Sequence, residues 1–134
     1  MRIGLAFAAE GIITGMMKVK DSYNLNRLSS VAATAALQDL PWMKRNVEQI
    51  QQSRRLLTQG LIRAGFYVYP SEANFVMAQK KGCKQKELYE TLKRKKIFVR
   101  YFETAGLDDS LRITVGTPQE IEVLLQALAD THHG

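Results

Sequence analysis

Cysteine is scarce in this sequence, and its scarcity limits the kind of protein that the chain can be. The 134 residues include one cysteine, Cys83, so no disulfide bond can form within the chain. A small scaffold held together by disulfides is thereby excluded, and a reducing, cytoplasmic setting is expected. Cys83 itself is interpreted as inert, because no histidine lies near it in the sequence to activate its thiol.

Histidine is scarce as well. His132 and His133 stand together near the C-terminus, and they could bind a metal only with ligands from distant parts of the sequence. No metal site is therefore predicted. Residues 132–134 are interpreted as a terminal tail.

Long apolar runs are also missing. The stretch from Ile3 to Met17 is fairly apolar, but Glu10 and three glycines interrupt it, and it is too short to cross a bilayer as a helix. It also lacks the basic start and the unbroken apolar core of a signal peptide. No membrane partner is predicted, and the absence of repeats and low-complexity tracts points to an ordinary globular domain.

The basic residues are concentrated in one part of the chain. The formal net charge is +6, and much of the excess falls between Lys80 and Lys96, around one predicted helix and the loop before it. We interpret this cluster as the solvated face of a helix, because no aromatic platform for bases interleaves with it. No nucleic-acid partner is expected, although a basic nucleic-acid-binding module that uses this cluster stays open as the weakest alternative.

Apolar periodicity in the first half of the chain predicts mainly helices. Arg54 falls within the apolar stripe of the longest of them, and its side chain is expected to extend along that stripe to reach solvent. The expected elements are a short buried strand over 2–8, a short helix with its apolar side over 12–17, a loop over 20–26, an alanine-rich helix over 27–39 and a long helix from Pro41 to a C-terminal cap at Gly65.

Short β-rich runs dominate the second half. Residues 66–69 and 73–78 are predicted to form an antiparallel hairpin or tight corner. A capping box of Thr117 and Glu120, with Pro118 at the first helical position, predicts the start of the final helix. Between them we expect a helix over 85–95, a strand over 97–100, a loop over 101–110 and a strand over 111–117.

The order of these elements predicts the fold class. From residue 27 onward, two helices are followed by two strands, a helix, two strands and a helix. This order is typical of an α/β domain of the α+β type, with a small, mostly antiparallel sheet of about four strands covered by helices.

Two arginines on the last two predicted strands form a candidate anion site. Alternation places Arg112 and Thr114 on the opposite face of their strand from Leu111 and Ile113. A guanidinium on a rigid strand can grip a carboxylate or a phosphate with two parallel hydrogen bonds. The structural alternatives are that Arg112 pairs with Asp108 or Asp109, and that Glu103 neutralises Arg100.

Four motifs in a fixed order carry a family resemblance. With Gly106-Leu107 between the last two, they resemble the C-terminal part of histidinol-phosphate aminotransferases, over nearly the whole chain. The motifs are Tyr23-Asn24-Leu25-Asn26, Pro70-Ser71-Glu72-Ala73-Asn74-Phe75-Val76, Ile97-Phe98-Val99-Arg100 and Leu111-Arg112-Ile113-Thr114-Val115-Gly116-Thr117-Pro118.

The resemblance implies a fold and an activity. Such enzymes depend on pyridoxal phosphate, have the aspartate aminotransferase fold type and act as homodimers in histidine biosynthesis. The implied reaction transfers an amino group between histidinol phosphate and 2-oxoglutarate, with glutamate as the other amino compound. The resemblance also divides the chain into a remnant of the large cofactor-binding domain over 1–22, a small domain over 23–131 and the tail over 132–134.

The resemblance also implies roles for substrate-binding residues. Arg112 is similar to the arginine that binds the substrate's acidic group, and Arg100 resembles a second arginine associated with the phosphate end. Tyr23 and Asn24 resemble a loop that lines the active-site cleft, and Asn74 a residue near the substrate. The alternatives are that Tyr23 is a half-buried loop tyrosine and that Asn74 only satisfies a backbone group in its corner.

The chain departs from the family at the cofactor. Arg2 resembles the arginine that clamps pyridoxal phosphate, but no lysine of this sequence occupies the motif that holds the cofactor covalently as a Schiff base. No catalytic residue is therefore assigned, and this chain alone is expected to be inactive as a truncated domain. The alternative hypothesis is a stand-alone anion-binding or interaction module with this fold, for which self-association is expected because apolar faces would be exposed.

Overall fold

The computed structural model describes residues 3–131 and divides the chain into two compact units, Met1–Arg45 and Asn46–Gly134. Arg2 and the histidine tail lie outside the described residues. The boundary between the two compact units does not test the domain division expected near residue 22, which stays a prediction. Each compact unit is described by itself below.

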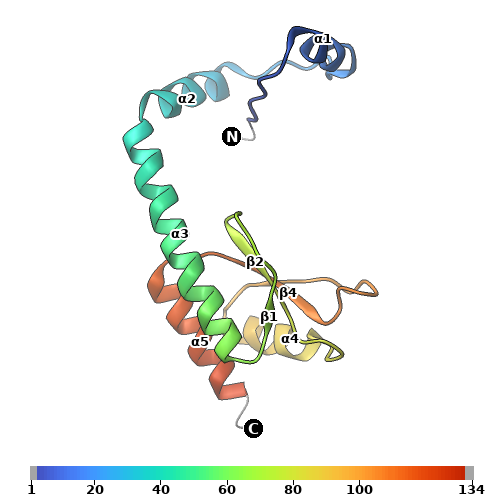
Figure 1. Cartoon of the computed structure of the whole chain (residues 1–134), viewed down its shortest axis with the longest axis vertical. Coiled ribbons are helices and arrows are strands. Elements are labelled where there is room, and N and C mark those ends of the chain that lie inside the picture. The colour runs from blue at the N-terminus through green and yellow to red at the C-terminus, as the bar shows by residue number, and fades with distance from the viewer. Residues whose placement is uncertain (1–2, 132–134) are drawn as a thin grey trace. The chain divides into compact units, whose positions relative to one another are not determined.

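The first unit is built from helices. It contains α1 (Glu10–Val19), α2 (Arg27–Gln38) and the first residues of α3 (Leu40–Arg63) (Figure 1). Asn26 caps α2, because its Oδ1 accepts a hydrogen bond from the Ser29 backbone N–H at 2.8 Å. The predicted helices and the loop between them are confirmed.

The prediction of a strand over 2–8 is wrong for residues 3–8, which are the part of this range that the structure describes. Residues 3–8 form no strand, and residues 4–8 are exposed. A strand needs a neighbour to pair its backbone N–H and C=O groups, and the described part of the first unit holds only helices and loops. The apolar sequence therefore has no sheet to join within this unit.

The second unit is a four-stranded antiparallel sheet with helices, as predicted. The strands lie in the order β1-β2-β4-β3. They are β1 (Tyr67–Val68), β2 (Phe75–Gln79), β3 (Arg100–Tyr101) and β4 (Ser110–Thr114), with α4 (Lys86–Arg94) before β3 and α5 (Pro118–Thr131) after β4. The strands expected over 97–100 and 111–117 are shorter and slightly shifted, because β3 pairs with β4 at only two positions.

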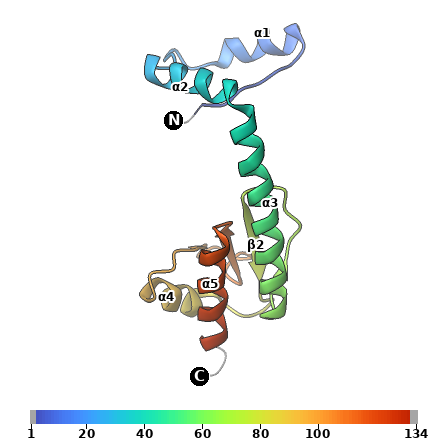
Figure 2. The same ribbon diagram turned by 90° about the vertical axis from the view of Figure 1, so that its left-hand side faces the viewer.

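One face of this sheet forms the core. Val76 and Ala78 of β2 and Leu111 and Ile113 of β4 are buried with apolar residues of α3, α4 and α5. The helical contribution consists of Leu57, Leu61, Leu92, Ile121, Leu124, Ala127 and Leu128. In both views α5 runs beside the second half of α3 (Figures 1 and 2). The alternation predicted for β4 is confirmed.

Two helix boundaries follow the predicted chemistry. Gly65 has a φ of +81°, which a residue with a side chain rarely adopts, and its N–H donates to the Ile62 carbonyl at 3.0 Å. At α5 the Thr117 N–H donates to Glu120 Oε2 at 2.7 Å, and the Glu120 N–H donates to Thr117 Oγ1 at 3.3 Å. The glycine cap and the capping box are both confirmed.

The apolar stripe of α3 is core only in its second half. Leu57 and Leu61 are fully buried, whereas Val47 and Ile50 remain 42% and 36% exposed. Periodicity therefore identified the correct face of α3 but not how far along the helix packing extends. Of the described helices, none has both the length and the apolar character that a membrane crossing requires.

The expectation that the Arg54 side chain reaches solvent is wrong. Its side chain is only 12% exposed, so it does not extend into solvent. Its guanidinium pairs with the Glu72 carboxylate and donates from Nη1 to the Ala73 carbonyl at 2.9 Å. Arg54 thus holds the corner between β1 and β2 against α3, because two adjacent residues of that corner accept its donors.

α3 and α5 approach each other closely at Gly60. A Cβ atom at this position would lie 2.3 Å from Cδ1 and 2.6 Å from Cδ2 of Leu125. Gly60→Ala should therefore lower the free energy of unfolding by about 1 kcal/mol, because overpacking outweighs the gain in helix propensity. In a Leu125→Ala background the same change should become neutral or stabilising. Equal effects in the two backgrounds, measured by urea unfolding, would contradict this packing.

Candidate functional site

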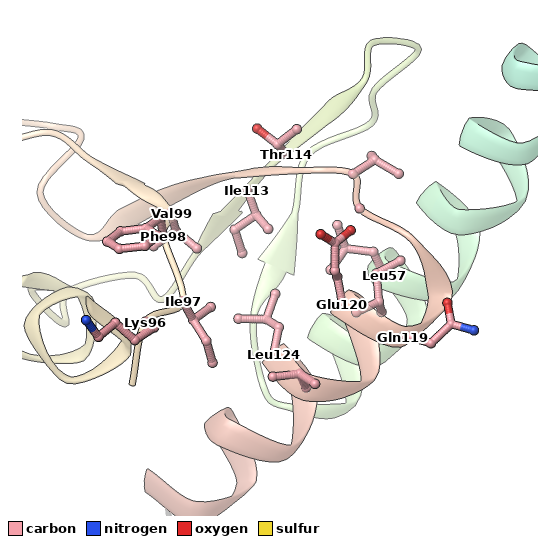
Figure 3. A pocket seen from close by; sticks show the side chains of 14 residues that line it. Leu57, Lys96, Ile97, Phe98, Val99, Ile113, Thr114, Gln119, Glu120 and Leu124 are labelled. Carbon is pink, nitrogen blue, oxygen red and sulfur yellow. The ribbon is translucent and has the colours of Figure 1, made fainter. Parts of the chain in front are cut away.

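The exposed face of the sheet places the two predicted arginines opposite each other. Arg100 of β3 and Arg112 of β4 are register partners, so their side chains leave the same face on adjacent strands. Met77 of β2 is the partner of Arg112 on the other side. Figure 3 shows Thr114 pointing away from this core while Ile113 points into it toward Leu124. The arginines therefore lie on the face that the helices leave open.

The pairing of Arg100 with Arg112 destabilises the sheet unless a negative group compensates the two positive charges. Like charges directly opposite each other on neighbouring strands destabilise a sheet. Among the described residues, neither arginine forms an ion pair. An anion placed between the two guanidiniums would remove the repulsion and could accept several N–H donors.

The nearby acids are occupied elsewhere. Lys86 donates to Glu103, and this hydrogen bond, with the charge of Lys86, holds the pKa of Glu103 below its usual range. Asp108 forms an ion pair with Lys84, with 3.6 Å between Asp108 Oδ2 and Lys84 Nζ. The interpretation that Glu103 neutralises Arg100 is therefore wrong.

The Asp109 carboxylate is also engaged by other groups. Gln79 donates from Nε2 to both carboxylate oxygens of Asp109, at 3.0 and 3.1 Å, and Ser110 Oγ donates at 2.9 Å. The hydrogen bond from Gln79 is the main reason why the pKa of Asp109 lies below its usual value. The alternative pairing of Arg112 with Asp108 or Asp109 is therefore wrong as well.

Aromatic rings take the place of carboxylates beside the arginines. Cζ of Arg100 lies over the Phe102 ring, 5.4 Å from its centroid. Cζ of Arg112 lies 6.0 Å from the same centroid and 5.3 Å from that of Phe75. These distances are in the range of cation–π interactions. Sequence reasoning missed Phe75 and Phe102, although the two-residue spacing from Arg100 to Phe102 indicates a common face.

Asn74 lies immediately before β2, next to Phe75. The corner is closed by Ser71 instead, whose Oγ donates to the Phe75 carbonyl at 2.6 Å and accepts from the Ala73 N–H at 3.1 Å. Within the described chain the Asn74 side chain forms no hydrogen bond. The interpretation that this side chain satisfies a backbone group of the corner is therefore wrong, and its amide is available to a ligand.

Tyr23 and Asn24 belong to the first unit, in the loop between α1 and α2. Tyr23 is 85% exposed, so it is not the half-buried loop tyrosine of the structural alternative. Asn24 Oδ1 accepts a hydrogen bond from Lys20 Nζ at 3.3 Å. The active-site roles of these two residues stay predictions.

The described residues do not fit a covalently held pyridoxal phosphate. Such a cofactor needs a lysine whose amine is desolvated and whose pKa is lowered. Every described lysine is exposed except Lys80, which is partly buried and lies over the Phe66 ring. The pKa of Lys86 is raised by Glu103, the opposite of what the chemistry requires. Nor do the described residues bring His, Cys, Asp and Glu together as a metal site would require.

A cavity of about 570 Å³ opens on the other side of the sheet, beside α5 (Figure 3). Its walls come from residues 96–99, the end of β4 and the first turns of α5, and they are mainly apolar. The Glu120 carboxylate at its rim is already engaged by Thr117. Lys96 is the one cationic residue among those that line it, and neither Arg100 nor Arg112 reaches it.

Comparison with known proteins shows clear sequence relatives. The family model for aminotransferase class I and II matches residues 1–128. The histidinol-phosphate aminotransferase of Synechocystis sp. is 47% identical over 129 residues, which cover 96% of this chain and 37% of that protein. Histidinol-phosphate aminotransferase 1 of Nostoc sp. is 41% identical over 130 residues, which cover 97% of this chain and 37% of that protein. The chain thus spans little more than a third of the length of these curated relatives.

Solved structures agree on the fold. The histidinol-phosphate aminotransferase from Sinorhizobium meliloti, in complex with pyridoxal-5'-phosphate, superposes with a TM-score of 0.75 at 26% identity over 90% of this chain and 33% of its own. The enzyme of the same name from Clostridium acetobutylicum gives a TM-score of 0.79 at 23% identity, over 92% of this chain and 38% of its own. The expected aminotransferase-type fold is confirmed.

The ion pair of Lys86 and Glu103 gives a pH-dependent prediction. In Lys86→Met, the pKa of Glu103 should rise toward its usual value of about 4.3, because its hydrogen-bond donor and nearest charge are gone. Any stabilisation from this pair should be complete above about pH 4.3 and disappear as the pH falls through the lowered folded-state pKa. Carboxyl ¹³C NMR titration measures the change. Lys84→Met is the control and should raise this pKa less; an equal rise would refute the assignment.

Proposed function

Because this chain belongs to the family of class I and II aminotransferases, we propose that it is the part of a histidinol-phosphate aminotransferase that holds the anionic groups of the substrates. The reaction of the whole protein would transfer an amino group between histidinol phosphate and 2-oxoglutarate, in histidine biosynthesis and with pyridoxal phosphate as the electron sink. The lysine that holds the cofactor would come from a part of the whole protein outside this sequence.

The observation that supports this proposal most strongly is the pairing of Arg100 with Arg112 across β3 and β4. The nearby acids Glu103, Asp108 and Asp109 are all engaged with other groups. A site that concentrates positive charge on rigid strands, and whose neighbouring acids are paired with other groups, suits an anionic ligand.

The two substrates present different anions to this site. Histidinol phosphate carries a phosphate ester, whereas glutamate and 2-oxoglutarate carry carboxylates. A guanidinium can bind either group with two parallel hydrogen bonds. We assign Arg112 to the anionic group that each substrate presents, the phosphate of histidinol phosphate or a carboxylate of glutamate and 2-oxoglutarate, and Arg100 to a second contact with the phosphate. Holding the substrate in this way lowers the barrier by fixing its orientation.

The remaining residues of the proposed site are less directly supported. Asn74 is assigned to the substrate because its amide is free of partners within the described chain. Tyr23 and Asn24 are assigned to a loop that lines the cleft, and Arg2 to the cofactor's phosphate, on the resemblance alone. A homodimer in the cytoplasm is part of the same proposal; the exposure of Val47 and Ile50 on α3 is consistent with a further packing partner.

A stand-alone anion-binding module is the second candidate. The same arginine pair favours it, because anion binding needs neither the cofactor nor its lysine. The two candidates differ in whether the chain is joined to the rest of an aminotransferase. An in-frame coding region that continues upstream through a Ser-Lys motif would favour the enzyme, and its absence would favour the module.

Substitution of the arginines tests the anion site. Arg112→Ala should weaken the binding of histidinol phosphate and of 2-oxoglutarate by about tenfold or more, because a charge-assisted hydrogen-bond pair is lost. Arg100→Ala should weaken histidinol phosphate more than 2-oxoglutarate. Calorimetry or NMR titration at fixed salt measures both. Arg94→Ala, an exposed arginine bound to Thr91, is the charge-matched control. Equal losses in all three variants would contradict a specific site.

Reaction of the chain with pyridoxal phosphate tests whether any of its lysines holds the cofactor. When the chain is incubated with pyridoxal phosphate and reduced with borohydride, mass spectrometry should find low modification spread over many lysines, because the described lysines are mostly exposed. No transamination of histidinol phosphate should occur. A stoichiometric adduct at one lysine, or measurable turnover, would contradict the proposal that this chain does not hold the cofactor by itself.

A further inference from the structure

Both arginines of the proposed anion site lie beside one aromatic ring. Phe102 follows β3 by one residue and sits on the same face as Arg100, at a distance of 5.4 Å between Cζ of Arg100 and the ring centroid. Arg112 reaches the same ring from the neighbouring strand, at 6.0 Å. Phe102 is thus the described residue whose ring contacts both guanidiniums.

The Phe102 ring can reduce the repulsion between the two guanidiniums without occupying their N–H donors, which a carboxylate would occupy. Two guanidiniums on adjacent strands repel each other, and the negative face of an aromatic ring attracts both. A carboxylate would also neutralise them, but it would accept the same N–H donors that a ligand needs. An aromatic ring has no carboxylate oxygens to accept these hydrogen bonds, so it leaves the N–H donors of a neighbouring guanidinium to a ligand.

We propose that Phe102 is a positioning residue for substrate binding: its ring holds the guanidiniums of Arg100 and Arg112 together on the open face of the sheet and leaves their N–H donors free for the substrate's phosphate or carboxylate. This inference rests on the proposed function of the arginine pair and goes beyond it. Phe102 touches no substrate in this account and acts only through the two arginines.

Phe75 provides an internal comparison. Its ring lies 5.3 Å from Cζ of Arg112, and no contact with Arg100 is observed among the described residues. It is also more exposed than Phe102. If shared positioning of both arginines is what matters, a change at Phe102 should affect anion binding more than the same change at Phe75.

The test uses the full chain with inorganic phosphate and histidinol phosphate as probes. Phe102→Leu keeps an apolar side chain but removes the aromatic face, and should weaken binding of both probes by about threefold to tenfold. Phe102→Tyr keeps the face and should bind within about twofold of the original chain. Phe75→Leu should show a smaller loss than Phe102→Leu. The thermal midpoint of each variant is measured alongside.

A second readout separates positioning from a purely structural role. The side-chain Nε–Hε NMR signals of both arginines should shift together in Phe102→Leu, because both lose the ring current, while Phe102→Tyr should largely preserve them. In Phe75→Leu only the Arg112 signal should shift. Retained affinity in Phe102→Leu, or equal losses in the Leu and Tyr variants, would overturn the proposal.

These outcomes are distinguishable from failure of the proposed function. If Arg112→Ala and Arg100→Ala weaken binding but Phe102→Leu does not, the arginine site stands and the role of Phe102 fails. If neither arginine variant alters phosphate binding, the anion site and the inference built on it fail together.

Discussion

The antiparallel register that sets Arg100 opposite Arg112 is the constraint on which the proposed site depends. The same register sends Leu111 and Ile113 into the core, where they pack with α3, α4 and α5. A slip of one residue along β4 would exchange the two faces, burying the arginines and exposing the core. Because burying unpaired charge is very costly, the packing of the core and the location of the arginines are fixed by one and the same pairing.

A site of this kind must keep its charges from being satisfied internally. In this chain a lysine, an amide and a hydroxyl engage two of the acids: Lys86 binds Glu103, and Gln79 and Ser110 bind Asp109. Aromatic rings then occupy the space beside the guanidiniums. The first effect occupies the acids that would compete with a ligand for the arginines, and the second reduces repulsion without using the N–H donors. Together they leave a positive surface on rigid strands, which is the property that the proposed anion site requires.

Sequence patterns predicted those parts of the structure that depend on local chemistry. The alternation in β4, the glycine cap at Gly65 and the capping box at Thr117 are each decided within a few residues. Partners far apart in the sequence were not predictable in this way. Arg54 meets Glu72 across 18 positions and Lys86 meets Glu103 across 17, and only the fold brings each pair together. The strand expected over 2–8 failed for a related reason, because its pairing neighbour is not set by its own residues.

The proposed joint binding of the substrate's anion by Arg100 and Arg112 can be tested with a crystal structure of the chain bound to histidinol phosphate. Phosphate oxygens should then lie within hydrogen-bond distance of both guanidiniums, on the open face of the sheet and beside the Phe102 ring. A phosphate bound instead to the lysines between Lys80 and Lys96, or arginines that turn away to pair with Glu103 or Asp109, would contradict it.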